Sequence, residues 1–139
     1  MTTSHPQVDL LDLDRVLDSP PDQAGEGKFV LITDGQTWHL VVGSVTGYRY
    51  HANLVDAFCT GHAIPTAWLK KPDQVEILES RVRVLGGGWI EAAPSRGSVV
   101  LHGYSKAYGA CDRTTLEWLA SSLSRTHERE FKVGSEPAL

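Results

Sequence analysis

Hydrophobic residues along this chain gather in short runs whose spacing changes from that of a strand to that of a helix. The segment 28–33, KFVLIT, is a continuous apolar run rich in β-branched residues, which predicts a buried strand. Residues 34–36, DGQ, are typical of a hairpin turn, so we expect 37–43 to form the partner strand. Within 54–59 the apolar positions are spaced i, i+1, i+4 and i+5. This spacing predicts a helix that ends at Gly61.

The second half of the chain continues this alternation after one irregular stretch. Pro65 and Pro72 bracket a short apolar segment, so we expect 62–74 to be an irregular excursion with at most a short helix. Residues 75–85 predict one strand, and the three glycines at 86–88 indicate a bend or a close backbone approach within the sheet. The elements expected after them are two extended runs at 89–93 and 98–105 joined by a turn at 94–97, a helix that begins near Asp112 with apolar positions at Leu116, Leu119, Ala120 and Leu123, and a strand at 130–133.

The order of these elements is strands, helix, strands, helix and a last strand. It predicts an α/β fold of the α+β type, in which a single mixed β-sheet of about six strands packs with two α-helices. The chain has 139 residues and shows no repeat and no linker, so we expect 1–139 to be a single domain. Residues 1–27 are expected to be an acidic N-terminal arm and a candidate edge strand, with 22–27 as a flexible connector.

Composition narrows the classes of partner. Thirteen Lys and Arg against 17 Asp and Glu give a formal charge of −4, which argues against nucleic acid as a partner. No apolar run approaches the roughly 20 residues that span a bilayer, and the N-terminus lacks the order of a signal peptide, so we expect a cytoplasmic monomer without a membrane partner. Of the two cysteines, Cys59 lies on the apolar helical stripe and is expected to be a buried thiol. Cys111 stands near a helix start, where a thiol pKa can fall, but no motif supports a reactive role.

His51 is the first candidate for chemistry. It stands where an extended segment passes into a helix, and the positive end of the helix dipole disfavours imidazolium, so the ring is expected to stay neutral and able to accept a proton. The same position attracts anions such as a phosphoryl group. Arg49 lies two residues earlier, so strand periodicity predicts that it faces the same side. The alternative is a surface or hydrogen-bonded histidine without a chemical role.

The second candidate is the loop 103–112, GYSKAYGACD, which leads from a strand end into a helix. Glycines permit unusual backbone angles there, Ser105 supplies a hydroxyl, and the successive amides from Ser105 to Ala107 are suited to cradle phosphate oxygens. Lys106 and Arg113 add positive charge. The alternative is a plain connector between strand and helix.

The histidines do not form a metal motif. All six are scattered, with no pair at i, i+4 and no H-E-x-x-H sequence. Sequence spacing leaves open whether His62 or His102 approaches His51 in space. We therefore expect a site with no metal and no cofactor.

Four segments in this order resemble the small phosphohistidine phosphatases of the Janus/Ocnus family. They are 28–32 (KFVLI), 50–52 (YHA), 85–88 (LGGG) and, most specifically, 103–109 (GYSKAYG). With gaps, the similarity runs over 16–133. The resemblance implies a mixed sheet of about half a dozen strands with two helices.

The resemblance also implies an activity: hydrolysis of phosphohistidine in proteins without metal or cofactor. By match of motif, the histidine that acts on the phosphoryl group is His51. Lys28 corresponds to a lysine that the family uses near the phosphate, and Ser105 and Ala107 to the hydroxyl and backbone amides that hold its oxygens. The implied partner is a histidine-phosphorylated protein or a small phosphoramidate.

The chain departs from the family pattern at two arginine positions, which correspond here to about Gly43 and to Trp89. The spacer between His51 and Leu85 is also longer than usual. Loss of two cations weakens phosphate binding, because charge-assisted contacts are stronger than neutral ones. Cations that could compensate from other positions are Arg49, Lys106, Arg113 and Arg83.

These departures leave two further functions open. One is a phosphate- or phosphoprotein-binding module of the same fold that has no catalytic activity, since a fold persists when its chemistry drifts. The other is a phosphatase for another phosphoramidate, such as phospholysine, with Trp89 and the 62–74 excursion as altered walls of the site.

Overall fold

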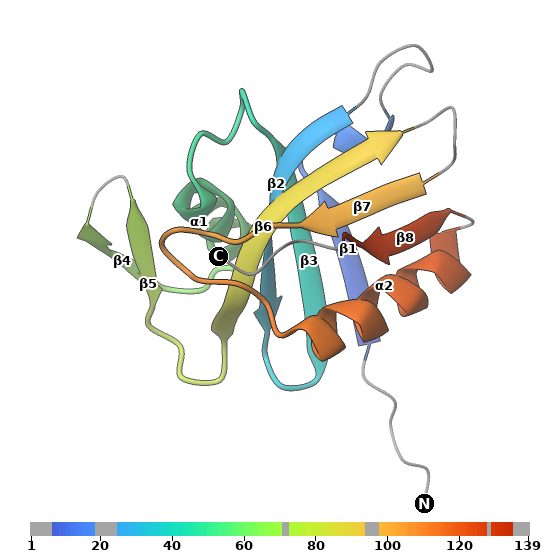
Figure 1. Cartoon of the computed structure of the whole chain (residues 1–139). Helices are drawn as coiled ribbons and strands as arrows, with labels where there is room; N and C mark the ends of the chain where they lie inside the picture. Colours follow the sequence, from blue (N-terminus) through green and yellow to red (C-terminus); the bar gives the residue numbers. More distant parts are fainter. Residues whose placement is uncertain (1–6, 19–24, 71–72, 94–97, 128, 135–139) are drawn as a thin grey trace, which may run out of the picture.

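The computed structural model describes residues 7–18, 25–70, 73–93, 98–127 and 129–134. These residues form two helices, a 3-10 turn and eight strands, coloured along the sequence in Figure 1. In chain order the elements are β1 (Gln7–Asp12), η1 (Val16–Asp18), β2 (Gly25–Thr33), β3 (Thr37–Ser44), α1 (His51–Gly61), β4 (Thr66–Lys70), β5 (Gln74–Ile77), β6 (Arg83–Ala93), β7 (Ser98–His102), α2 (Arg113–His127) and β8 (Glu130–Val133).

Six of the strands form one mixed sheet in the order β1-β3-β2-β6-β7-β8. The central pairs β2–β3, β2–β6 and β6–β7 are antiparallel, whereas each edge strand, β1 and β8, pairs in parallel with its neighbour. The predicted fold class, one mixed sheet of about six strands with two helices, is confirmed. The N-terminal arm supplies the edge strand β1, and the buried Val16 and Leu17 of η1 add to the core.

The sheet is buried on both faces, and this explains the continuous apolar run in β2. Phe29 and Leu31 point to one face, where they pack in the same cluster as the buried side of α2. Val30 and Ile32 point to the other face, against the buried side of α1. Because alternate residues of a strand face opposite sides, a strand between two layers needs apolar residues at every position. The sheet therefore lies between the two helices (Figure 1).

Local capping sets where each helix begins. The backbone N–H of Tyr50 donates to Asn53 Oδ1 at 2.9 Å at the start of α1. Asp112 caps α2, since its Oδ2 accepts the Thr115 N–H at 3.0 Å, as predicted from its position. The predicted apolar stripe of α2 is buried. No helix among the described residues is long and apolar enough to cross a membrane.

Two predictions about the middle of the chain are wrong. The 62–74 excursion is not irregular, because β4 and β5 pair as an antiparallel hairpin that stands beside the main sheet (Figure 1). Residues 75–85 do not form one strand, since β5 ends at Ile77 and a turn separates it from β6. Pro65 lies before Thr66, the first paired residue of β4, so it does not prevent a hairpin.

Two further predictions concern the three glycines at 86–88 and the flexible connector expected at 22–27. Gly86, Gly87 and Gly88 lie inside the long strand β6, and a Cβ at Gly87 or Gly88 would lie 2.7 Å from the Phe29 carbonyl oxygen or 2.5 Å from that of His102, so the expected close backbone approach is confirmed. Gly86 has φ +140°, which a side chain rarely adopts. The connector prediction is wrong for Gly25–Gly27, which already belong to β2.

Candidate functional site

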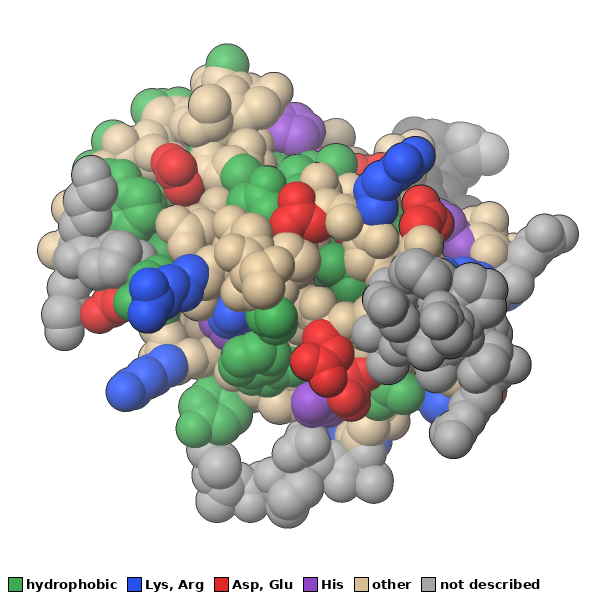
Figure 2. Space-filling view, turned by 90° about the horizontal axis from the view of Figure 1, so that it is seen from above, with side chains coloured by type: hydrophobic (Ala, Val, Ile, Leu, Met, Phe, Trp, Pro, Cys, Tyr) green, Lys and Arg blue, Asp and Glu red, His purple; other side chains and the backbone are tan. Residues whose placement is uncertain are grey.

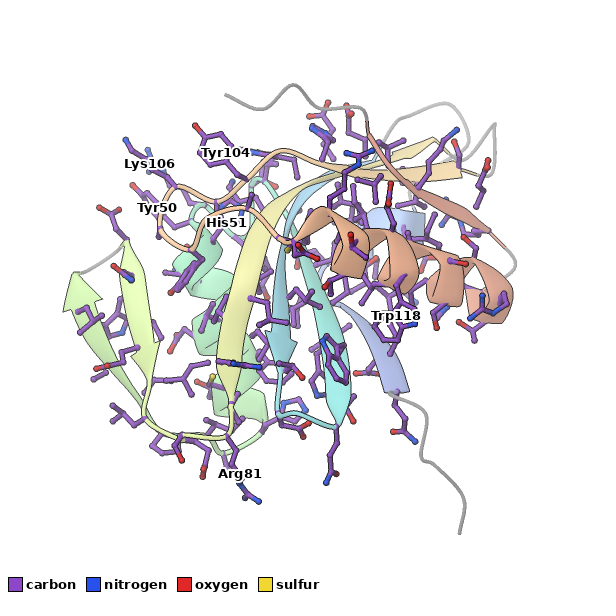
Figure 3. All side chains as sticks on the ribbon, turned by 60° about the horizontal axis from the view of Figure 1, so that its bottom comes forward. Tyr50, His51, Arg81, Tyr104, Lys106 and Trp118 are labelled. Atoms are coloured by element: carbon purple, nitrogen blue, oxygen red, sulfur yellow. The ribbon has the colours of Figure 1, made fainter. Side chains whose placement is uncertain are left out.

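A pocket of about 770 Å³ opens where the start of α1 meets the loop after β7 and the start of β5. Figure 3 shows four of its labelled residues, Tyr50, His51, Tyr104 and Lys106, at this end of the molecule, whereas the labelled Trp118 and Arg81 lie elsewhere. Seen from above in Figure 2, Lys or Arg side chains, a histidine and hydrophobic side chains lie next to one another left of centre. The lining residues are three cations (Lys28, Arg49, Lys106), three large aromatics (Tyr50, Trp89, Tyr104), His51, Asp73, Gln74 and Ala107.

Two residues that line the pocket, Lys28 and Trp89, belong to a row of paired residues that crosses three strands. Lys28 on β2 pairs with Gly43 on β3 and with Trp89 on β6. Directly paired residues of antiparallel strands lie on one face, here the α1 face. The Lys28 ammonium lies over the Trp89 ring, with Nζ 4.7 Å from the ring centroid. Burial lowers the Lys28 pKa below its ordinary value of 10.5.

This row contains both positions at which the sequence departs from the family arginines. A side chain at Gly43 has no space, since its Cβ would lie 2.4 Å from Cδ2 of Tyr48 and 2.7 Å from Cδ2 of Leu54. Trp89 fills the second position and is partly exposed in the pocket wall. Lys28 is therefore the one cation of this three-residue row.

His51 is the first residue of α1 and is 8 % exposed. Its Nε2 lies 2.8 Å from the carbonyl oxygen of Gly88. A carbonyl only accepts hydrogen bonds, so Nε2 carries the proton and Nδ1 of the neutral ring keeps its lone pair. Burial, opposed by the Gly88 hydrogen bond and assisted by the Lys28 charge, lowers the His51 pKa below 6.5. The neutral ring predicted from the helix start is supported, but burial is its largest cause.

The imidazole ring has close neighbours on both sides. Its centroid lies 6.0 Å from that of Trp89, with the planes almost perpendicular at 87°. A Cβ at Gly87 would lie 3.1 Å from His51 Cδ2 and 2.7 Å from the carbonyl oxygen of Phe29. The absence of a side chain at Gly87 thus leaves the space that the ring occupies. The strand β6 fixes the ring by this close approach and by the Gly88 hydrogen bond.

The loop after β7 closes on itself beside the pocket. The Ser105 N–H donates to the Gly109 carbonyl at 3.1 Å, and the Gly109 N–H donates back to the Ser105 carbonyl at 2.8 Å. Ser105 Oγ accepts the Tyr108 N–H at 3.1 Å. In this described loop, the backbone amides of Lys106 and Ala107 have no partner within the protein. Of the three predicted cradle amides, two remain available to an anion at the pocket wall.

The β4–β5 hairpin is held beside the pocket because Tyr108, in the loop after β7, binds its backbone. The Tyr108 hydroxyl accepts the Val75 N–H at 2.9 Å and donates to the Val75 carbonyl at 3.0 Å. Tyr108 thereby pairs with both backbone groups of Val75, as a neighbouring strand would. This contact holds Asp73 and Gln74 at the pocket.

The structure brings together five of the seven predicted site residues. Two of the predictions need correction: Ser105 is 1 % exposed and its hydroxyl is turned into the loop, and Arg113 lies on α2, where it contacts Glu117 at 3.2 Å and the Gly134 carbonyl at 3.0 Å. Neither lines the pocket. The residues that do line it are Lys28, Arg49, His51, Lys106 and Ala107.

Arg49 reaches the pocket for a reason other than the one predicted. β3 ends at Ser44, so Arg49 and His51 do not share a strand. Arg49 lies in the turn before α1, with its guanidinium 5.9 Å from the Tyr50 ring centroid. Tyr50 and Tyr104 also line the pocket and were not predicted as site residues, whereas Asp73 and Gln74 belong to the 62–74 segment that was expected as a wall under the phospholysine alternative. These residues lie beside His51, in the GYSKAYG loop and in the long spacer, but no motif in the sequence marks them individually as pocket residues.

Neither cysteine lines the pocket, and neither do His62 and His102. Cys59 is buried in the core, as expected, and burial raises its pKa to about 11. Burial and Asp112 raise the Cys111 pKa to about 12, so its helix-start position does not lower it. His62 stacks on Phe58, with ring centroids 4.2 Å apart. Among the residues that the structure describes, no group of three His, Cys, Asp or Glu is arranged to hold a metal ion.

Comparison with known proteins identifies one family. The model of the Janus/Ocnus family (Ocnus) matches residues 14–126, which include both helices' buried faces and the whole pocket row. No curated protein matches the chain.

Proposed function

The chain belongs to the Janus/Ocnus family, and from this premise we propose that it is a metal-independent phosphatase that hydrolyses the P–N bond of phosphohistidine in proteins. His51 is its general base or phosphoryl acceptor. The observation that carries the proposal is the neutral imidazole of His51, with its tautomer set by Gly88, in a pocket lined by three cations.

The His51 tautomer assigns the reacting atom. Nε2 is the hydrogen-bond donor to Gly88, so Nδ1 is the atom with a lone pair. As a general base, Nδ1 takes a proton from water while the water oxygen forms a bond to phosphorus. As a nucleophile, the same Nδ1 lone pair forms the bond to phosphorus and water later releases phosphate. In both cases the P–N bond of the substrate breaks and its electron pair stays on the leaving nitrogen.

The remaining pocket residues stabilise negative charge on the phosphoryl oxygens. The Lys28 charge acts directly on His51, since it lowers the pKa of that imidazole. The unpaired amides of Lys106 and Ala107 are preorganised donors in the loop. Stabilisation of this kind is the largest contribution to catalysis in phosphoryl transfer. Arg49 and Lys106 add charge at the lining of the pocket.

Phosphate release from three phosphorylated side chains tests the proposal. Wild-type protein is incubated with phosphohistidine, phospholysine and phosphotyrosine peptides in the presence of a chelator. We expect phosphate release from phosphohistidine and slower or no release from phosphotyrosine. No release from any of the three peptides, together with measurable binding, would overturn the catalytic proposal.

The residues at positions 43 and 89 favour the two alternative functions, a binding module without turnover and a phosphatase for another phosphoramidate, and the same test distinguishes them. Gly43 and Trp89 deprive the pocket row of cations, which is what a binding module without turnover predicts. Trp89 and the β4–β5 hairpin also alter the walls of the pocket, which is what a change of substrate to phospholysine predicts. Faster release from phospholysine than from phosphohistidine would identify the latter.

The activity is expected to depend on pH with two limbs. His51 acts as the neutral base, so turnover rises with pH as the imidazole loses its proton, and the lowered His51 pKa places this limb below pH 6.5. On that limb, activity falls about tenfold for each further unit of acidification. Loss of the Lys28 proton weakens the phosphoryl contact, so an alkaline limb lies below pH 10.5. The measurements are kcat/KM from pH 5 to 10, which reports the pKa values of the free enzyme, and an NMR titration of the His51 ring.

The variant Lys28→Arg supplies the control for this profile. A guanidinium stays charged throughout this range, so the alkaline limb should disappear while the acid limb remains. An acid limb with its midpoint above pH 6.5, or activity that increases as His51 is protonated, would contradict the assignment of a neutral base.

A further inference from the structure

The pocket is not uniformly positive. Its cations, Lys28, Arg49 and Lys106, share the lining with one carboxylate, Asp73. Lys28 comes from the sheet and Lys106 from the loop after β7, whereas Asp73 stands directly before β5, on the hairpin wall. One pocket therefore presents positive groups from the sheet and loops and a negative group from the hairpin.

A carboxylate is unfavourable in a site that binds only a phosphate ester. A phosphate monoester carries negative charge alone, so a carboxylate in the same pocket repels it. A phosphoramidate differs, because its nitrogen can be protonated while the phosphoryl oxygens remain negative. Such a substrate has both charges, and complementary charges across a site provide specificity.

The position of Asp73 is set by the fold. Tyr108 binds both backbone groups of Val75, two residues after Asp73, and belongs to the loop whose Lys106 and Ala107 amides are available to an anion. The same loop therefore positions the candidate anion cradle and the wall with the carboxylate. Asp73 itself is half-buried, so its side chain is part of the wall.

From this distribution of charge we propose that Asp73 determines specificity for phosphoramidates whose nitrogen-containing leaving group is protonated, over phosphate esters. The inference rests on the proposed function and names the feature of the substrate that the site reads. The Asp73 carboxylate accepts a hydrogen bond from the N–H of the protonated leaving group. Lys28 and the loop amides hold the phosphoryl oxygens.

The step balances with water as the only co-reactant. For phosphohistidine protonated on its second ring nitrogen, the water oxygen bonds to phosphorus and Nδ1 of His51 takes a water proton. The P–N electron pair moves to the ring nitrogen, so the imidazolium leaves as neutral imidazole and keeps its N–H. The Asp73 carboxylate stabilises the positive ring before and during bond cleavage.

Binding of two small anions tests the inference without any need for turnover. The probes are phosphoramidate, the simplest species in which a protonated nitrogen is bonded to phosphorus, and inorganic phosphate. Both are titrated at pH 7 into wild type and Asp73→Asn. We expect Asp73→Asn to lower the preference for phosphoramidate over phosphate by about tenfold to a hundredfold, the effect of losing one hydrogen bond to a charged group. The phosphate affinity itself should stay constant or increase.

The matched control is Glu76→Gln, which removes the same charge from an exposed position on the same hairpin. Glu76 does not line the pocket, so its loss should leave the preference unchanged. The variant Asp73→Glu should restore part of it. An unchanged preference in Asp73→Asn would overturn the inference.

Turnover distinguishes this inference from the proposed function. With phosphohistidine and phosphotyrosine in peptides whose other residues are all alanine, Asp73→Asn should lower the ratio of kcat/KM values by the same factor as the binding preference. If wild type does not hydrolyse phosphohistidine but Asp73→Asn still changes the binding preference, the proposed function fails and the inference stands. If wild type hydrolyses phosphohistidine and the ratio does not change, the proposed function stands and the inference fails.

Discussion

Replacement of His51 by alanine is expected to lower kcat for phosphohistidine by about 10²- to 10⁴-fold, which is the usual contribution of a general base. Phosphate affinity should change much less, because Lys28 and the amides of Lys106 and Ala107 remain in place. His51 lines the pocket and belongs to neither core cluster, so its replacement leaves both clusters intact. The measurements are steady-state phosphate release and phosphate titration of both proteins.

The control is His62, a second histidine that caps the C-terminal end of α1. His62 follows the last residue of α1, is exposed, and stacks on Phe58 rather than facing the pocket. The variant His62→Ala should therefore keep nearly full kcat. Similar kcat in wild type and His51→Ala would show that another group reacts. Equal loss in the two histidine variants would point to a general effect on the fold.

The elements with a strong periodic signal were predicted from the sequence. The 28–33 run, the apolar stripe of α1 and the Asp112 cap all have local causes that the structure confirms. The β4–β5 hairpin was missed because its strands are short, and its attachment to the pocket is through a contact between Tyr108 and Val75, 33 residues apart. No periodicity within 62–74 carries that information.

The site was predicted where the signal was a motif and missed where it was a cross-strand contact. His51 and Lys28 were identified by pattern and resemblance, and both line the pocket. Trp89 was identified as a departure from the family and a candidate wall, whereas its contact with Lys28 follows from register. The inward turn of Ser105 depends on the loop closing through Gly109, which spacing alone does not determine.

Replacement of Gly87 by alanine is expected to damage both the fold and the site. The new Cβ would lie 2.7 Å from the Phe29 carbonyl oxygen, so β2 and β6 must separate, and 3.1 Å from both His51 Cδ2 and Ser105 Cβ. Overpacking of this kind costs about 1–3 kcal/mol of unfolding free energy. Displacement of a catalytic group by about 1 Å lowers the rate by about a hundredfold. We therefore expect a lower urea midpoint and a kcat reduced by about that factor.

The loss of stability and activity expected for Gly87→Ala comes from the position of this glycine and not from the added methyl group itself. The variant Gly61→Ala adds the same group at a position with free space and is the control. Gly61 ends α1, and a Cβ there would have no neighbour within 4 Å. Alanine also favours a helix over glycine, so Gly61→Ala should keep full activity and equal or greater stability. If Gly87→Ala folds with wild-type stability but loses turnover, the His51 ring has moved to make room while β2 and β6 stay paired. If Gly87→Ala keeps wild-type turnover, the close approach of β6 does not hold the imidazole in its reactive position, because the ring would then tolerate a neighbour in the space that Gly87 leaves open.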